Sequence, residues 1–342
     1  MQTSVVPLIL APMAGYTNLP FRALVRTTAG GVDYTVTELV NARSLIEKNS
    51  EALRLVRLSE EDIPCGVQLF GNVTQEMAEA ARIAESHGSS FIDINMGCPA
   101  PKIFKNGGGS ALLAQPEAAL KLVEAVRQAV KIPVTVKMRL GIEPYDLVAS
   151  DLALMFQDAG VQSITIHGRY RSQGFGGDVS LEGIAAVVQA AQKIPVFANG
   201  DVTTLENARL MLAKTGAAGL SIGRGALYNP WIFKEIKGNL SINPSFQKRL
   251  EFMTRHLETM AQLYGEGSAC SQFRKIAPFY TRRMGPAREV NRQISHCTSI
   301  AQFHQIMEDY LKERVRFLDE DGELKHAYQP RPMHSSLDQH LL

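Results

Sequence analysis

Eight short apolar runs, separated by segments with helical spacing, constrain the fold of this chain more than any other feature. The runs cover residues 8–12, 34–38, 64–70, 91–95, 133–139, 163–168, 195–200 and 219–223. They are rich in Val and Ile and nearly continuous in apolar character, which is typical of strands buried on both faces of a parallel sheet. The segments between them, such as 75–88 and 118–131, have the apolar spacing of amphipathic helices. Eight strand–helix units in roughly 240 residues predict an α/β fold of the TIM-barrel type, a (β/α)8 barrel.

The pattern changes after about residue 240. Met253, Leu257, Met260 and Tyr264 recur on one face of a predicted helix, and no further strand pattern follows. Residues 322–342 contain two prolines and scattered polar residues without a period. We therefore predict a barrel domain with the active site over residues 1–240, a smaller all-helical domain over 241–321 and a mobile tail over 322–342.

Composition excludes several functional classes. Thirty-six Lys and Arg against 34 Asp and Glu give a net charge of +2, which excludes a uniformly basic coat for nucleic acid but leaves room for a local basic patch. No apolar run reaches the ~20 residues of a membrane span, and the N-terminal residues lack the pattern of a signal peptide. The four cysteines are widely separated and form no CxxC motif, so nothing supports a metal site. We expect a monomeric, cytoplasmic protein that binds neither a metal nor a membrane.

Polar residues and glycines gather where the predicted strands end, and a barrel of this type has its active site at those carboxyl ends. Strands seven and eight end in the turns ANGD (198–201) and IGRG (222–225). These turns predict a phosphate site, because glycines let the backbone approach a ligand closely, although each could also be a simple tight turn. The strand-end residues are Pro12, Met13, Ala14, Glu38, Gln68, Asn95, Cys98, Lys137, Arg139, His167, Asn199, Gly200, Asp201, Gly223, Arg224 and Gly225.

Four of these side chains have two interpretations each. Lys137 could stabilise negative charge on an electron-accepting ring at the barrel mouth, or form an internal ion pair. His167 and Gln68 could contact a ligand, or be hydrogen-bonded core residues. Cys98 lies in a turn at the predicted catalytic rim, which favours a catalytic role over that of a small apolar residue. The glycines at 107–109 predict a hinge for a loop that closes over a substrate, although they could also form a plain turn or a phosphate-binding loop.

Several segments resemble, in order, the motifs of the tRNA-dihydrouridine synthases, with the bacterial B-type subfamily the most similar. The INMGCP segment followed by KNGGGSALL is highly specific, and the resemblance covers residues 7–235. It implies a flavoprotein with an N-terminal (β/α)8 barrel that holds FMN and a C-terminal helical domain that binds tRNA. The segments are APMAGYTNLPFR (11–22), TELV (37–40), QLFG (68–71), DINMGCPAPK (93–102), NGGGSALL (106–113), VKMRLG (136–141), HGR (167–169), ANGD (198–201) and IGRGAL (222–227).

The resemblance also implies a role for each matching position. Cys98 would be the proton donor, and Asn95 would lie beside the target base. Around the flavin ring the implied contacts are Pro12, Met13, Ala14, Gln68, Lys137 and His167, and at the FMN phosphate they are Asn199, Gly200, Asp201, Gly223 and Arg224. The further residues that we expect to contact tRNA are all basic: Arg139, Lys102, Lys105, Arg274, Lys275, Arg282 and Arg283.

The implied reaction is the reduction of a tRNA uridine to 5,6-dihydrouridine. NADPH (or NADH) reduces FMN, and a flipped-out uridine then receives hydride at C6 from the flavin and a proton at C5 from Cys98. One alternative is another FMN barrel that acts on a small molecule, such as a dihydroorotate dehydrogenase-like enzyme or an ene-reductase; another is an RNA-binding protein on a retired barrel. Segment 274–292 carries six basic residues and one acidic residue, which favours an enzyme that acts on tRNA, although such a segment could also be a solvated helix face.

Overall fold

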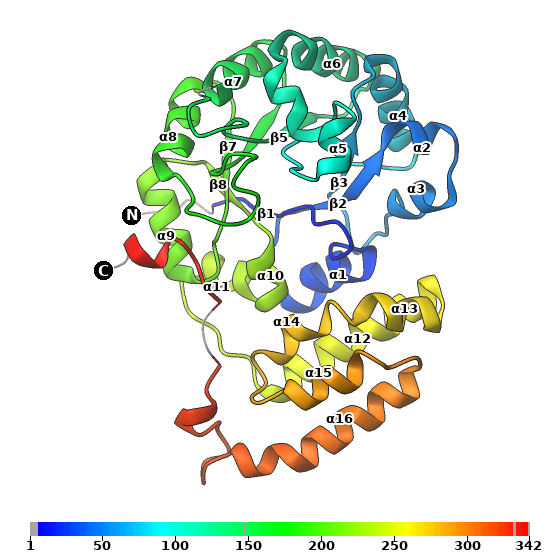
Figure 1. Ribbon diagram of the computed structural model, residues 1–342, viewed down its shortest axis with the longest axis vertical. Coiled ribbons are helices and arrows are strands. Elements are labelled where there is room, and N and C mark those ends of the chain that lie inside the picture. The colour runs from blue at the N-terminus through cyan, green and yellow to red at the C-terminus, as the bar shows by residue number, and fades with distance from the viewer. Residues whose placement is uncertain (1–5, 147, 331–332, 341–342) are drawn as a thin grey trace.

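The computed structural model describes residues 6–146, 148–330 and 333–340 of the chain. Within them, eight parallel strands form one closed barrel in chain order, which confirms the predicted (β/α)8 architecture (Figure 1). Pairing of β1 with both β2 and β8 closes the ring. The strands are β1 (Leu8–Leu10), β2 (Tyr34–Asn41), β3 (Cys65–Phe70), β4 (Phe91–Met96), β5 (Val134–Arg139), β6 (Ser163–His167), β7 (Val196–Asn199) and β8 (Gly219–Ile222).

Helices cover the outside of the barrel, so both faces of the sheet are buried. Gly88, Gly160 and Gly216 have positive φ where helices end, as their sequence positions predict. The predicted helices at 75–88 and 118–131 are present as α4 and α6. The helices are α1 (Leu19–Leu24), α2 (Ala42–Ile46), α3 (Ser50–Leu55), α4 (Thr74–Ser86), α5 (Pro101–Lys105), α6 (Pro116–Ala129), α7 (Val148–Asp158), α8 (Leu181–Ala190), α9 (Leu205–Thr215), α10 (Arg224–Tyr228) and α11 (Ile232–Gly238).

A group of helices follows the barrel, as the loss of strand pattern predicts. The predicted face of α12 is buried through Met253, Leu257 and Met260. An isolated antiparallel bridge between Leu318 and Leu324 follows the last α-helix. The domain limits at 240 and 321 remain predictions. The helices are α12 (Phe246–Tyr264), α13 (Glu266–Phe273), α14 (Ala277–Thr281), α15 (Arg288–Ile294) and α16 (Ile300–Arg314).

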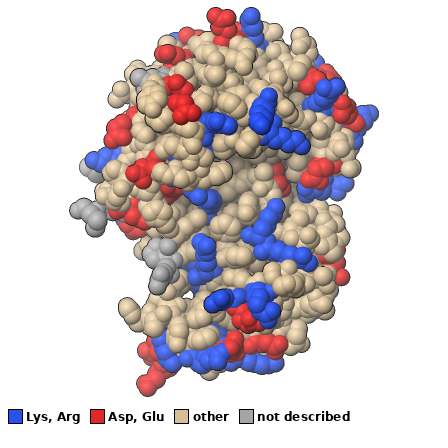
Figure 2. Space-filling view, in the orientation of Figure 1, with Lys and Arg blue, Asp and Glu red and all other residues tan. Residues whose placement is uncertain are grey.

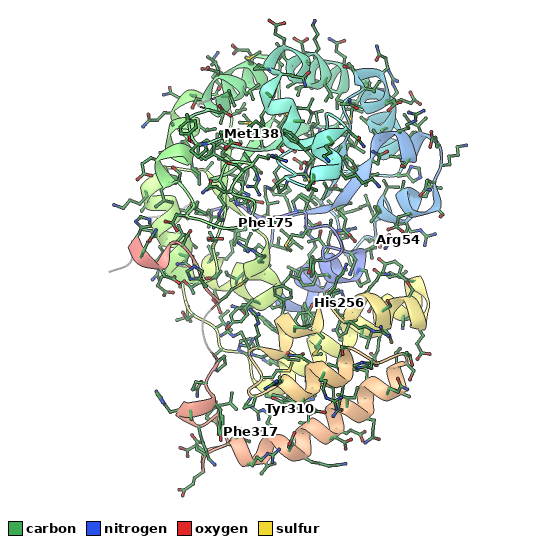
Figure 3. All side chains as sticks on the ribbon, in the orientation of Figure 1. Arg54, Met138, Phe175, His256, Tyr310 and Phe317 are labelled. Atoms are coloured by element: carbon green, nitrogen blue, oxygen red, sulfur yellow. The ribbon has the colours of Figure 1, made fainter. Side chains whose placement is uncertain are left out.

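The helical part packs against α1, the helix that follows β1. The ring of Phe21 lies 6.4 Å from that of Phe252 and 5.5 Å from that of His256, centre to centre. His256 is fully buried, and its ring nitrogens lie 2.8 Å from the Tyr280 hydroxyl and 3.0 Å from Asn18 Oδ1. Because α1 begins near the carboxyl end of β1, this packing holds the helical part beside the mouth of the barrel (Figure 3).

The tail predicted at 322–342 runs back from the helical part to the barrel, where its end lies beside α9 (Figure 1). Ser335, Ser336 and Leu337 are buried there. The mobility of the tail remains a prediction, and residues 331–332 and 341–342 lie outside the described residues. Across the described part of the chain, no helix has the length and apolar character needed to cross a membrane.

Candidate active site

A pocket of about 490 Å³ opens at the carboxyl ends of the strands, where the sequence places the site. Its volume is in the range of cofactor and small-ligand pockets. Twelve of the thirteen strand-end residues predicted to contact cofactor or substrate line this pocket: Pro12, Met13, Ala14, Asn95, Lys137, Arg139, His167, Asn199, Gly200, Asp201, Gly223 and Arg224. Cys98 lines it as well, whereas Gln68 does not.

A hydrogen-bonded chain beneath the pocket explains the position of Gln68. The Gln68 amide donates to Asp93 Oδ2 at 2.6 Å and accepts from Asn95 Nδ2 at 2.8 Å. Asn95 Oδ1 in turn accepts from the main-chain N–H groups of Gly97 and Cys98, at 3.2 and 3.0 Å. Asn95 therefore fixes the turn that carries Cys98, and Gln68 holds Asn95. A contact of Gln68 with the cofactor remains a prediction.

Lys137 and Arg139 make one wall of the pocket positive. Lys137 Nζ donates to Asn199 Oδ1 at 3.0 Å, and burial, followed by the charge of Arg139, lowers the pKa of Lys137 to about 8. Arg139 donates to the carbonyl oxygens of Gly97 and Tyr170, both at 2.9 Å. Burial and the charge of Arg169 lower the pKa of Arg139 to about 10. Arg139 thus ties the turn of Cys98 to the loop after β6, while Lys137 faces the pocket.

His167 is a neutral side chain at the end of β6. Burial, followed by the charges of Lys137, Arg139, Arg169 and Arg224, holds its pKa well below the ordinary value. Its Nε2 lies 3.4 Å from Arg169 Nη1, where a neutral ring accepts a hydrogen bond. The histidine is therefore a hydrogen-bonding group of the pocket and carries no charge at neutral pH.

The loop after β7 is organised around Asp201. Arg169 binds its carboxylate with two hydrogen bonds of 3.0 and 2.5 Å, and Arg224 binds it with one of 2.8 Å. Burial opposes ionisation, but the hydrogen bonds and charge of Arg169, together with Ser336, hold the pKa of Asp201 below its usual value. At the preceding position Gly200 has φ of 130°, and a Cβ there would lie 3.1 Å from the His167 ring. Glycine is therefore required at this position by the protein's own packing, and the close approach of a ligand to this backbone remains a prediction.

One polar group of the pocket has no partner within the described residues. The hydroxyl of Ser221, on β8, is buried and unpaired, and its residue lines the pocket. A buried hydroxyl without a hydrogen bond is costly, and a bound ligand would remove that cost. Sequence reasoning missed Ser221, although a lone polar residue in the apolar run GLSIG is a signal that could have found it. This hydroxyl, the positive wall and the glycine loops fit a large, polar, anionic ligand such as FMN.

An exposed aromatic ring stands at the rim of the pocket. Phe175, in the loop after β6, is 63% exposed and lies between the guanidinium groups of Arg139 and Arg224, at 5.6 and 5.7 Å (Figure 3). Phe279 of α14 lines the same pocket from the helical part, and its ring meets that of Tyr16 edge-on. Sequence reasoning missed Phe175, because a single aromatic residue in a glycine-rich loop gives no periodic signal.

The basic residues predicted to contact tRNA have different surroundings. Lys275 and Arg282 are exposed, and Lys275 Nζ lies 5.4 Å from the centre of the Tyr16 ring. Arg283 is half-buried and stacks on Tyr228 at 5.3 Å. Arg274 instead donates to the Cys297 carbonyl at 3.1 Å, inside the helical part. Three of the four are therefore positioned at the surface, and Arg274 has a structural contact.

Lysines and arginines gather around the hollow between the barrel and the helical part (Figure 2). Lys102 and Lys105 lie exposed on α5, just after the turn of Cys98. They do not line the pocket. A basic surface therefore runs along the route from the helical part to the pocket mouth, which is the arrangement that a polyanion requires.

The other cysteines have no place in this site. Cys65, Cys270 and Cys297 are buried, and Cys98 is half-buried. Among the residues that the structure describes, no group of three or more His, Cys, Asp or Glu side chains could hold a metal ion. Cys98 is therefore the thiol that a ligand in the pocket can reach.

Comparisons with known proteins show the family of this chain. The model of the family described as dihydrouridine synthase matches residues 9–315. A probable tRNA-dihydrouridine synthase of Rickettsia conorii is 37% identical over 321 residues, 90% of this chain and 96% of that protein. The tRNA-dihydrouridine synthase B of Klebsiella pneumoniae is 37% identical over 313 residues, 89% of this chain and 96% of that protein.

The barrel is also similar to that of a solved structure, a 2-naphthoyl-CoA reductase. The TM-score is 0.54 and the sequence identity 12%, over 68% of this chain and 50% of that one. At this identity the likeness shows the fold alone. The family match covers most of the chain and includes every residue of the pocket except Met333 and His334. The chain belongs to the dihydrouridine synthase family.

Proposed function

We propose that this chain reduces uridines in tRNA to 5,6-dihydrouridine, with bound FMN as the cofactor and NADPH (or NADH) as the electron donor. The observation that carries the proposal is the half-buried thiol of Cys98 at the rim of a positively lined pocket in a chain of this family. The names of its relatives support tRNA as the substrate. Such a substrate also supports a cytoplasmic location.

Different pocket residues would contact different parts of the cofactor. When bound, FMN would supply the hydride that the reaction requires. Lys137, beside Asn199, would place a positive charge next to the electron-rich part of the ring. Arg224 is 42% exposed, so it can reach a phosphate while Arg169 retains Asp201. The unpaired Ser221 hydroxyl would gain a hydrogen-bond partner.

Cys98 would hold the proton that completes the reduction. Asn95 pairs with Lys137 in the register of β4 and β5, so the turn of Cys98 begins directly beside the Lys137 wall. Hydrogen bonds from Gly97 and Cys98 to Asn95, and from Arg139 to Gly97, keep that turn in place. A fixed donor at the rim can protonate a base that lies in the pocket without first reorganising.

The rim supplies contacts for RNA. The ring of Phe175 offers a stacking surface at the pocket mouth, and a flipped-out base can stack on such a ring. Lys275 and Arg282 lie exposed on the helical part, and Lys102 and Lys105 lie exposed on α5. These side chains would contact phosphates on either side of the pocket and hold the folded tRNA over it.

The test is conversion of uridine in tRNA. Purified protein should release FMN on denaturation and, with NADPH, should add two hydrogens to uridine in tRNA from a strain that lacks this gene. Mass spectrometry of the digested tRNA detects the product and maps its position. Release of FAD, or NADPH oxidation with a small enone or orotate but no change in tRNA, would contradict the proposal and favour a small-molecule reductase.

A further inference from the structure

Residues 333–338 lie against the pocket loops that we propose to hold the FMN phosphate. We call residues 333–338 the C-terminal strap. Ser335 Oγ donates to the Asp201 carbonyl at 2.6 Å, and Ser336 Oγ donates to Asp201 Oδ2 at 2.9 Å. Ser336 Oγ also accepts from the main-chain N–H of Val179 at 3.1 Å. Asn207 of α9 donates to Asp338 at 3.0 Å. The strap thus joins the loops after β6 and β7.

Burial shows that this contact is a packed one. Leu337 is fully buried and belongs to the main hydrophobic core, and Ser335 and Ser336 are 1% and 5% exposed. Met333 and His334, at the start of the strap, line the pocket itself. The family match ends at residue 315. The strap, which lies beyond it, therefore adds a wall to the pocket of this chain.

The hydrogen bonds of the strap converge on one carboxylate. Asp201 is also bound by Arg169 and by Arg224, and each of the two carboxylate oxygens receives bonds from at least two groups. Without Ser336, one carboxylate oxygen would lose the main-chain and hydroxyl donors that share it with Arg169. The strap therefore adds two hydrogen bonds to the carboxylate that also binds Arg224.

We propose that the C-terminal strap closes the phosphate end of the cofactor pocket and slows the release of FMN. This inference rests on the proposed function, because it takes FMN as the ligand. Within the described residues, the hydrogen bonds of the strap to the barrel go to Val179, Asp201 and Asn207. In the part of the chain that the structure describes, the strap makes no such bond to the turn of Cys98 or to β5, so we expect its effect to fall on cofactor retention and to leave the chemistry of the base unchanged.

The test measures FMN release without NADPH or tRNA. The first variant stops after Pro330, the second combines Ser335→Ala with Ser336→Ala, and the control is Gln339→Ala, whose side chain is exposed. After dilution of loaded protein, release followed by flavin fluorescence should be roughly ten- to hundredfold faster in the truncated chain. The double serine variant should change in the same direction by a smaller factor, and the control should match the wild type.

Association rates separate closure from mere loss of stability. Opening the pocket should leave FMN uptake as fast as in the wild type or faster, whereas slower uptake would indicate a damaged barrel and overturn the proposal. Wild-type release rates in both variants would also overturn it. If the truncated chain does not fold, the double serine variant decides the question. A wild-type chain that takes up no FMN would overturn the proposed function itself, which is a distinct result from equal release rates.

Discussion

Cys98 owes its position to its neighbours. Of the four cysteines, all within the described residues, it alone is half-buried. Its main-chain N–H donates to Asn95, and its carbonyl accepts from the hydroxyl of Ser110 at 2.8 Å. The thiol itself therefore packs little of the core. Its removal should affect chemistry far more than folding or cofactor binding.

The variant Cys98→Ala tests this separation. Uridine reduction should fall by roughly 10²–10⁴, the usual contribution of a general acid, while FMN content and flavin reduction by NADPH stay at wild-type levels. Single-turnover reduction of tRNA by pre-reduced enzyme is the measurement. An unchanged rate would exclude Cys98 as the proton donor, and loss of FMN would make it a structural residue.

Lys137 should give cofactor binding a dependence on pH. Its pKa is lowered to about 8, so its amine is charged below that pH and neutral above it. If the charge attracts the flavin, the affinity of FMN-free protein for FMN should fall about tenfold between pH 7 and pH 9. Titration of Lys137→Met, which lacks the amine, should show weaker binding that is flat over this range. An equal fall in the variant would assign the pH effect to another group.

Residue types at strand ends could be predicted from the sequence, but their partners could not. The spacing of eight buried strands placed Lys137 and His167 at one mouth, where the structure has them. Gln68 and Ser221 show the limit of that reasoning. Contacts between strands decide that Gln68 bonds Asp93 and that the Ser221 hydroxyl is left unpaired. A single sequence does not record those contacts.

At the scale of elements, the basic segment from α13 to α15 has two kinds of arginine. Arg274 donates to the Cys297 carbonyl and ties the end of α13 to the connection between α15 and α16, whereas Arg282 is exposed to solvent. A count of basic residues in the sequence treats both arginines alike, because it gives their charge and not their burial. The structure therefore changes the choice of variants for testing the RNA surface.

Charge reversal at exposed positions should weaken tRNA binding. The double variant Lys275→Glu with Arg282→Glu should bind tRNA less tightly and show a flatter dependence of affinity on salt, because fewer counterions are released. FMN content should not change. Titrations at several salt concentrations measure this. A wild-type slope would move the RNA surface to Lys102 and Lys105 on α5.

Arg274→Ala is the control for the charge-reversal variant, and we expect it to change stability and not tRNA binding. Loss of its hydrogen bond to the Cys297 carbonyl should lower the unfolding free energy by roughly 1–3 kcal/mol. The salt dependence of tRNA binding by the folded protein should stay near that of the wild type. Urea unfolding and the same titrations check both parts, and a flattened salt slope with unchanged stability would make Arg274 an RNA contact.

At the scale of the whole molecule, His256 joins the barrel to the helical part. Burial lowers its pKa to about 3, so its ring is neutral while it bonds Asn18 and Tyr280. In the unfolded chain a histidine takes up a proton near pH 6.5. The unfolded state therefore binds more protons below that pH, and stability is lost as the pH falls from 6.5 toward 3.

Between pH 7 and pH 5 the wild type should lose about 2 kcal/mol more unfolding free energy than His256→Gln, which cannot titrate. The variant is expected to be less stable at pH 7, because glutamine cannot fill the same buried space. Urea unfolding at several pH values gives both quantities. Parallel pH curves for the two proteins would show that His256 is not the group responsible.

The overall architecture was more predictable than the contacts between its parts. Continuous apolar runs and helical spacing are local signals, and they located all eight strands and the long helix α12. The packing of α1 on α12 and the return of Ser335 and Ser336 to Asp201 join positions far apart in the chain. Short polar segments of this kind carry no period, so their partners emerge only in three dimensions.

The packing of α1 on α12 has a consequence for the order in which a growing chain can fold. Asn18 and His256 are separated by 238 positions, and β1 finds its second neighbour only in β8. During synthesis the first strand and helix therefore leave the ribosome long before their partners exist. Phe21, fully buried in the finished protein, stays without its cover until α12 has been made. The apolar surface of β1 and α1 is therefore exposed for most of the time that the chain is being synthesised.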